Sequence, residues 1–263
     1  MDGLMDWSAA DLPLFLLALT RVSGMVFLAP IFGSPSHPPQ VRALLSLLLA
    51  VLFFPSLRGT AVAMPPDVWT LLLAAGGELA VGMCIGFASA LLFAGVQFAG
   101  QIVDQELGIQ QANLLDPFSG ETISVVGQLK VFLATLVFLL INGHHFLLQA
   151  VGDSFRSVPP LAFAPSTAAV TALSDTMITD LLRMGVQIAA PTLVTLFLVT
   201  VALAFMARTV PELNIFVLGF ALRAGVGLGV LALGVGVFVS GFAERALRHA
   251  QTVNTVVGTL VGP

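Results

Sequence analysis

The feature that most constrains this chain is a series of long apolar runs, several of which carry a single charge in their interior. Six runs can be marked: Leu12–Phe32, Ala43–Leu57, Val68–Val96, Thr122–Ile141, Met184–Met206 and Ile215–Phe242. A helix needs about 20 apolar residues to cross the hydrocarbon core of a bilayer. The runs are continuous rather than alternating, which excludes the strands of a membrane barrel. The sequence therefore predicts an all-α, polytopic membrane protein of about six hydrophobic helical segments.

Composition supports this prediction and excludes other classes of protein. The chain has 263 residues, of which 57% are hydrophobic and 9% are charged, whereas soluble domains carry about 25% charged residues. This balance excludes a disordered chain, and a net charge of -4 argues against binding to nucleic acid. Cys84 is the single cysteine, so no intrachain disulfide can form. The acidic N-terminus lacks the basic residues of a secretory signal, and the first run is expected to stay in the mature chain.

The apolar runs differ in length. Ala43–Leu57 is short for a complete span, whereas Val68–Val96 and Ile215–Phe242 are long. The long runs are expected to tilt, to bend, or to consist of two half-segments.

Four charges lie inside apolar runs, at Arg21, Glu78, Lys130 and Arg223. A charge at the centre of a membrane helix costs about 2.5–3.5 kcal/mol on insertion scales. Either these side chains reach a helix end and the interface, or they are buried against protein or water inside an assembly. Glu78 has two plausible partners, Arg21 and Lys130, and the sequence does not choose between them.

Small residues recur at helical spacing in two runs. Gly82, Gly86, Ala90 and Ala94 form one stripe, and Gly225 with Gly229 repeats the spacing. Such stripes allow helix backbones to approach closely in membranes. The sequence therefore predicts close helix contacts in both runs.

The connections between runs carry most of the polar residues. Gly33–Arg42 contains three prolines and predicts a tight extended turn. Gln97–Glu121 is a polar stretch that is too long to be a mere connector, and its Asp104 and Glu106 are either a proton relay or, more ordinarily, solvated charges. Asn142–Arg183 is longer still, with Ser166 as a possible N-cap.

No catalytic constellation stands out. His144 and His145 are adjacent, so on a helix they would point about 100° apart and make poor ligands for one metal. The glycines of Gly225–Gly229 lie inside an apolar run and do not match a dinucleotide fingerprint. We therefore expect no enzyme activity, no cofactor and no metal site.

The connections do match a known family. The matching blocks are Arg21, Pro30–Gly33, Pro38 and Arg42; Gly100–Asp104, Gly108 and Asp116–Pro117; Asn142–His144, Ser154–Phe155 and Pro159; and Arg208–Phe216 with Gly219–Phe220. In this series the chain resembles the FliR family of flagellar biosynthesis, which is related to the SctT subunits of virulence type III secretion systems. Two positions depart from the family pattern: Glu212 stands where glutamine is expected, and Ala221 where proline is common.

The resemblance implies a core subunit of the flagellar type III export gate. Its partners would be FliP-like and FliQ-like subunits, an FlhB-like switch protein, membrane lipid and unfolded secreted polypeptides, in the bacterial inner membrane at the flagellar basal body. Residues 1–183 would form a FliP-like portion and residues 184–263 a FliQ-like portion, with some helices as bent hairpins.

The resemblance also implies roles for single residues. A loop at about 110–124 would plug the channel, through Gln110, Asn113, Leu114, Leu115, Asp116 and Phe118. Inter-subunit or buried polar positions would be Arg21, Glu78, Asp104, Lys130, Asn142, His144, Arg208, Pro211, Glu212 and Arg223. Three alternatives stay open: an export-gate subunit of a virulence system, a secondary transporter that uses the intramembrane charges, and a structural membrane anchor.

Overall fold

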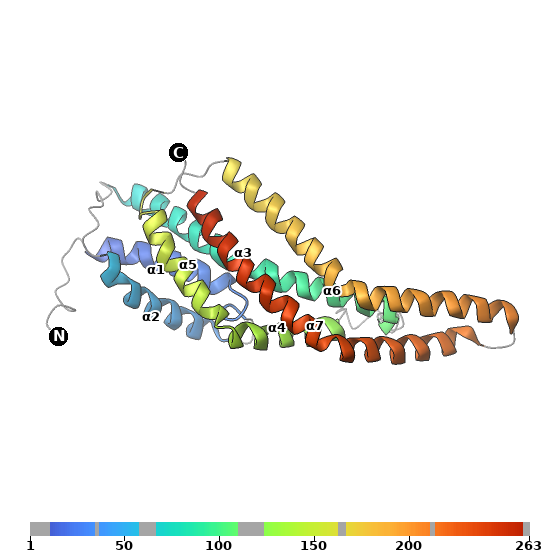
Figure 1. The fold of residues 1–263 in the computed structure, drawn as a ribbon. Coiled ribbons are helices and arrows are strands. Elements are labelled where there is room, and N and C mark those ends of the chain that lie inside the picture. The colour runs from blue at the N-terminus through green and yellow to red at the C-terminus, as the bar shows by residue number, and fades with distance from the viewer. Residues whose placement is uncertain are drawn as a thin grey trace. The chain divides into compact units, whose positions relative to one another are not determined.

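The computed structural model describes residues 11–34, 37–57, 67–109, 124–162, 167–210 and 214–259, and these residues are helical apart from short turns (Figure 1). The helices in chain order are α1 (Asp11–Leu28), α2 (Pro39–Leu57), α3 (Val68–Leu107), α4 (Val125–Leu140), α5 (Gly143–Ser157), α6 (Thr167–Thr209) and α7 (Ile215–Thr259). Within the described residues, 5 helices are long and apolar enough to cross a membrane, or up to 6 spans if α4 and α5 form one bent span. The prediction of an all-α polytopic membrane protein with about six segments is confirmed.

The second helix is longer than its apolar run. It begins at Pro39 and has 19 residues, so the run beginning at Ala43 underestimated the helix, and the extended turn predicted up to Arg42 is wrong at its end. Proline fits the first position of a helix because its missing N–H would be unpaired there anyway. The N–H of Val41 already donates to the carbonyl of Pro38 at 3.0 Å. With these added residues, α2 is long enough to be a candidate membrane span.

Three helices are far longer than one span requires. α3 has 40 residues, α6 has 43 and α7 has 45, whereas about 20 cross the hydrocarbon core. The long runs are therefore continuous helices within the described residues and not two half-segments. The polar stretch expected to begin at Gln97 is helical to Leu107, because Val103 and Leu107 are buried and hold that part of α3 in place. α3 ends where Gly108 takes a φ of 78°, a backbone conformation that glycine adopts readily.

The connection expected over Asn142–Arg183 is also mostly helical. α5 occupies its first part and α6 begins at Thr167, while Ser166 lies outside the described residues. Between α4 and α5, Asn142 adopts a left-handed conformation with φ 58° and ψ 33°. Asparagine tolerates this conformation better than most residues, so the break between the two helices falls at the Asn-Gly pair.

The chain divides into two compact units. Unit 1 contains residues 1–91, 142–177 and 246–263, and unit 2 contains residues 92–141 and 178–245. The core of unit 1 includes Leu17, Val22 and Met25 of α1. The core of unit 2 is formed by Ala99, Val103, Leu107, Val126, Ala189 and Leu196. The division into portions 1–183 and 184–263 is a statement about resemblance, and it stays a prediction.

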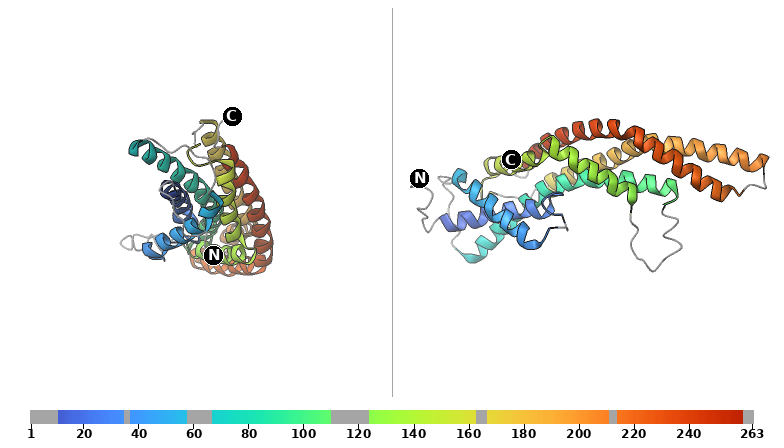
Figure 2. Two further views of the ribbon diagram at one scale, coloured as in Figure 1. Left: turned by 90° about the vertical axis from the view of Figure 1, so that its left-hand side faces the viewer. Right: turned by 90° about the horizontal axis from the view of Figure 1, so that it is seen from below.

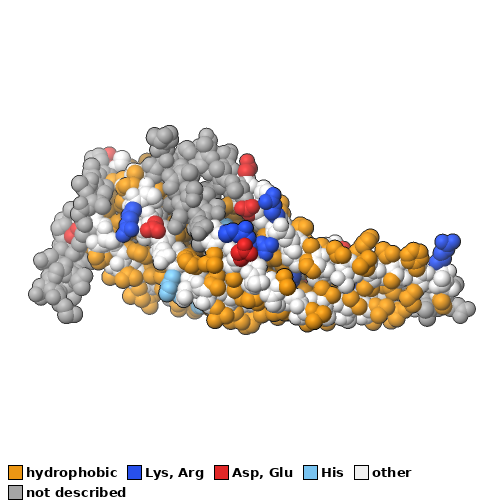
Figure 3. All heavy atoms as spheres, in the orientation of Figure 1, with side chains coloured by type: hydrophobic (Ala, Val, Ile, Leu, Met, Phe, Trp, Pro, Cys, Tyr) orange, Lys and Arg blue, Asp and Glu red, His pale blue; other side chains and the backbone are white. Residues whose placement is uncertain are grey.

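Within unit 2, α6 and α7 run side by side in opposite directions (Figures 1 and 2). Their outer faces stay apolar: Phe197 on α6 is 64% exposed and Leu233 on α7 is 87% exposed. In the face drawn in Figure 3, hydrophobic side chains cover much of the described surface of these helices. An apolar exterior of this kind is suited to lipid or to neighbouring helices rather than to water.

Candidate functional site

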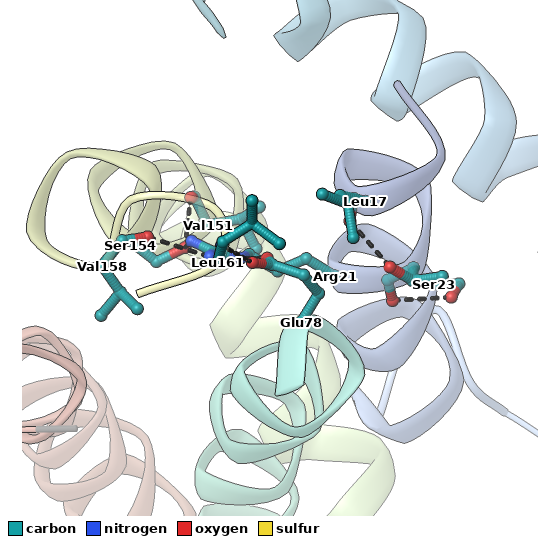
Figure 4. A network of polar contacts seen from close by, with 9 residues as sticks. Leu17, Arg21, Ser23, Glu78, Val151, Ser154, Val158 and Leu161 are labelled. Carbon is teal, nitrogen blue, oxygen red and sulfur yellow. Dashed lines mark hydrogen bonds and ion pairs between the residues drawn. The ribbon is translucent and has the colours of Figure 1, made fainter. Parts of the chain in front are cut away.

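The first candidate site is a buried ion pair in unit 1. Arg21 of α1 and Glu78 of α3 lie inside the unit with 0% of each residue exposed, and Arg21 Nε donates to Glu78 Oε2 at 2.6 Å (Figure 4). Of the two partners that the sequence offered to Glu78, the structure therefore has Arg21. Charges inside membrane helices almost always face the protein interior and pair with one another, and this pair does so.

The remaining polar atoms of this pair are engaged by the end of α5 and the turn after it. Arg21 Nη1 donates to Ser154 Oγ at 3.2 Å, and Nη2 donates to the carbonyl of Val158 at 2.9 Å. The backbone N–H of Leu161 donates to Glu78 Oε1 at 3.2 Å. We call these five residues the Arg21 cluster. Because every charged group has hydrogen bonds as well as its counter-charge, the cost of burying the pair is offset.

Two further features shape the Arg21 cluster. The guanidinium of Arg21 lies over the ring of Phe155, with Cζ 4.4 Å from the ring centroid, which is a cation–π contact. Leu161 has a φ of 73°, which is unusual for a residue with a side chain. This backbone conformation belongs to the same turn that aims the N–H of Leu161 at Glu78.

Glycines allow α1 and α3 to approach closely enough for the ion pair to form. A Cβ placed on Gly82 would lie 1.8 Å from the carbonyl oxygen of Arg21, and one on Gly24 would lie 2.6 Å from that of Leu79. A Cβ on Gly86 would lie 2.8 Å from the carbonyl oxygen of Met25. The predicted close contact of the first stripe is therefore confirmed for Gly82 and Gly86.

The second stripe behaves differently. A Cβ on Gly225 or Gly229 would meet nothing within 4 Å in the described part of the chain. The glycine of this region that does pack closely is Gly227, against Leu107 and Leu196. Within the described residues, the packed face of α7 is that of Gly227, and the close helix contact predicted at Gly225 and Gly229 stays a prediction.

The second candidate site lies in unit 2, where Asp104 of α3 meets the first turn of α4. Ser124 Oγ donates to Asp104 Oδ2 at 2.5 Å, and the backbone N–H of Val126 lies 3.2 Å from both carboxylate oxygens. Asp104 is 0% exposed, so the expectation of a solvated charge is wrong for it. Glu106, two residues further along the helix, is exposed as a solvated charge should be.

Lys130 belongs to the surroundings of Asp104. It lies on α4 four residues after Val126, is 7% exposed, and is drawn electrostatically to the Asp104 carboxylate. Its Nζ also lies 6.0 Å from the centroid of the Phe238 ring. The interior charge of the fourth apolar run is thus placed among groups that tolerate it.

The other predicted site residues are placed as follows. Asn142 and Arg208 are exposed, whereas His144 and Arg223 are partly buried. His144 Nδ1 and Arg223 Nε are buried atoms without a hydrogen-bond partner among the described residues. Outside the described residues lie Gln110, Asn113, Leu114, Leu115, Asp116, Phe118, Pro211 and Glu212.

Sequence reasoning missed the residues that complete the two clusters. Val158 and Leu161 give no signal of their own, because they act through backbone groups. Ser154 was noted only as part of a block that matches the family. Ser124 lies inside the marked run Thr122–Ile141. Serine is a typical N-cap, and its Oγ accepts from the N–H of Gly127 at 3.0 Å. Among the described residues, no group of three or more His, Cys, Asp and Glu side chains is arranged to hold a metal ion.

Comparison with known proteins decides which family this arrangement belongs to. The family described as "Bacterial export proteins, family 1" matches residues 12–248. The flagellar biosynthetic protein FliR of Bacillus subtilis is 32% identical over 224 residues, which cover 83% of this chain and 85% of that protein. This chain belongs to the FliR family.

Other FliR-family relatives come from flagellar and virulence systems. The flagellar biosynthetic protein FliR of Escherichia coli is 31% identical over 84% of each chain. The Yop proteins translocation protein T of Yersinia pestis is 31% identical over 75% of this chain and 74% of that protein. The FliR family is a family of export-apparatus membrane proteins and is not a known enzyme family. The resemblance inferred from the residue blocks is confirmed.

Proposed function

We propose that this chain is a core subunit of the flagellar type III export gate. It would form, together with FliP-like and FliQ-like subunits, the channel through which unfolded flagellar proteins leave the cell. The observation that carries this proposal is the match of the FliR family over residues 12–248, with flagellar FliR proteins of two species at 31–32% identity. The exposed apolar faces of α6 and α7 support it, because a subunit of a membrane assembly must present such faces to its neighbours.

The proposed mechanism is a channel closed by a segment of this chain. An export pore must block ions at rest and yet let an unfolded polypeptide through. A loop that moves between two arrangements meets both needs, and apolar side chains can close a narrow pore by expelling water. The segment 110–124 is proposed as this plug, with Leu114, Leu115 and Phe118 as the apolar stoppers. The chain's part would thus be to bind, to line and to close, without enzyme chemistry.

Deleting residues 113–120 tests the plug directly. The gate that carries this deletion should leak ions passively in cells that express the complete assembly, because the apolar stoppers are gone. The leak is measured as the rate of membrane depolarisation or of ion entry, at equal amounts of assembled gate in the membrane. A leak equal to that of the intact gate would show that this segment does not close the channel.

The proposed partners are tested by purification from the membrane. Affinity-tagged chain should be recovered with FliP-like and FliQ-like subunits in a stable complex, located in the inner membrane at the flagellar basal body. An FlhB-like switch protein and a secreted polypeptide are expected as weaker companions. Recovery of the chain as a homo-oligomer that moves a small solute would contradict the export-gate assignment and favour a secondary transporter.

Two observations bear on the alternatives. The 31% identity to a Yop translocation protein favours a virulence export gate as the second candidate, and the genes next to this one would distinguish the two systems. A secondary transporter needs free intramembrane charges for its solute. Arg21 and Glu78 are instead engaged by each other and by the turn after α5, which makes them poor candidates for such a site.

A further inference from the structure

We call Asp104, Ser124, Val126 and Gly127 the Asp104 cluster. It lies where the chain leaves α3 and where it returns to α4. Asp104 precedes the end of α3 at Leu107 by three residues, and its partners Ser124 and Val126 stand at the first turn of α4. The N–H of Gly108 donates to the carbonyl of Gln105 at 3.2 Å, which closes the last turn of α3. One carboxylate therefore contacts the structure on both sides of residues 109–123.

The charge of Asp104 suits this position. The first N–H groups of a helix have no partner within the helix and carry partial positive charge. Asp104 accepts from the N–H of Val126, and Ser124 Oγ both donates to Asp104 and accepts from the N–H of Gly127. Hydrogen bonds to an ionised acceptor are about twice as strong as neutral ones. Lys130, one turn further into α4, adds an attractive positive charge.

The backbones of α3 and α4 are in close contact at the same place. A Cβ on Gly100 would lie 2.1 Å from Cα of Gly127, and a Cβ on Gly127 would lie 2.2 Å from Ser124 Oγ. The two glycines thus remove the side chains that would keep the Asp104 carboxylate away from the start of α4. The end of α3 and the start of α4 lie side by side in the right-hand view of Figure 2.

From these contacts we propose that Asp104 is a positioning residue for the gate. Its carboxylate holds the first turn of α4 on the last turns of α3 and so fixes both ends of residues 109–123. This inference rests on the proposed function, in which those residues close the channel. Asp104 does not touch the transported polypeptide in this proposal; it acts through the placement of the segment that does.

The test replaces Asp104 by asparagine, which keeps the shape of the side chain and removes its charge. In the purified assembly, backbone hydrogen exchange of the peptide that spans Ser124–Lys130 should become about 10-fold faster or more, because hydrogen bonds to a charged acceptor hold this turn closed. In cells, the Asp104→Asn gate should leak ions at rest. Glu106→Gln is the matched control, since it removes an exposed carboxylate two residues away on the same helix and should change neither reading by more than about twofold.

A second variant keeps the test decisive if Asp104→Asn does not assemble. Ser124→Ala removes the hydroxyl that joins Asp104 to Gly127 and should accelerate the same exchange by a smaller factor. The double variant should exchange no more than about twofold faster than Asp104→Asn alone, because both substitutions break one shared network.

The outcomes separate this inference from the proposed function. Unchanged exchange in both Asp104→Asn and Ser124→Ala would overturn the positioning role. Faster exchange without a leak, in a gate where deletion of residues 113–120 does leak, would overturn it as well. If neither the deletion nor Asp104→Asn causes a leak while exchange is faster, the contacts of Asp104 stand and the proposed plug fails.

Discussion

Replacing Arg21 by leucine is expected to prevent a stable assembly from accumulating in the membrane. The substitution leaves Glu78 buried without its counter-charge, and breaking a buried pair from one side costs about 3–5 kcal/mol. It also leaves the Val158 carbonyl without its donor. The measurement is the amount of the chain in the membrane, together with the thermal midpoint of whatever assembly can be purified.

Two further variants show whether the ion pair is the cause. Arg156→Ala is the matched control, because Arg156 and Asp153 form a pair at 3.8 Å with exposed side chains, and such surface pairs contribute about 0–1 kcal/mol. The double variant Arg21→Met with Glu78→Met should recover much of the lost stability, since no buried charge is left. Recovery should be incomplete because Leu161 loses its acceptor. Full stability of Arg21→Leu would contradict the role of the pair.

Replacing Gly82 by alanine is expected to push α1 away from α3. It would thereby disturb the Arg21 cluster without changing any residue of the cluster. The new Cβ would lie 1.8 Å from the carbonyl oxygen of Arg21 and 3.1 Å from the nitrogen of Met25. Both are backbone atoms, so no side chain can turn away and the helices themselves must shift. Overpacking of this kind costs about 1–3 kcal/mol and occasionally more. The thermal midpoint of the purified assembly and its yield are the readings.

The control for Gly82 is available in the same helix. Gly76 lies six residues earlier in α3, and a Cβ there would meet none of the described residues within 4 Å. Gly76→Ala should be neutral or slightly stabilising, because alanine is favoured over glycine in a helix by about 0.5–1 kcal/mol. Gly24→Ala, from the facing helix, should destabilise in the same direction as Gly82→Ala. Equal behaviour of Gly76→Ala and Gly82→Ala would show that the contact of α1 with α3 does not limit stability.

Much of the architecture follows from local pattern. Continuous apolar runs predict helices, and each of the described helices contains or overlaps an expected run, apart from α5. The bounds were harder to predict because apolarity ends before the helix does. α3 continues through Gln97 to Leu107 since its buried side chains, Val103 and Leu107, return every fourth residue between polar ones. The α2 start at Pro39 was hidden by the prolines that suggested a turn.

The candidate sites were predictable in part. The sequence predicted that the charges of Arg21, Glu78 and Lys130 need partners, because each is an ionisable group inside an apolar run. The residues themselves did not indicate burial of Asp104, since Gln101, Gln105 and Glu106 beside it are polar; it was named only through the family resemblance. The backbone groups of Val158 and Leu161 cannot be read from any sequence pattern, because every residue except proline carries the same donor and acceptor.

By itself the sequence determined that this chain is a helical membrane protein of the FliR family, with charges that require burial and glycines that allow close packing. The tertiary structure alone decided that Glu78 pairs with Arg21, 57 residues away, and that Asp104 joins the end of α3 to the start of α4. The physical reason is range. Helix formation and membrane insertion depend on residues within a few turns of one another. The choice of a buried partner depends instead on which helices contact each other and on which of their residues lie side by side.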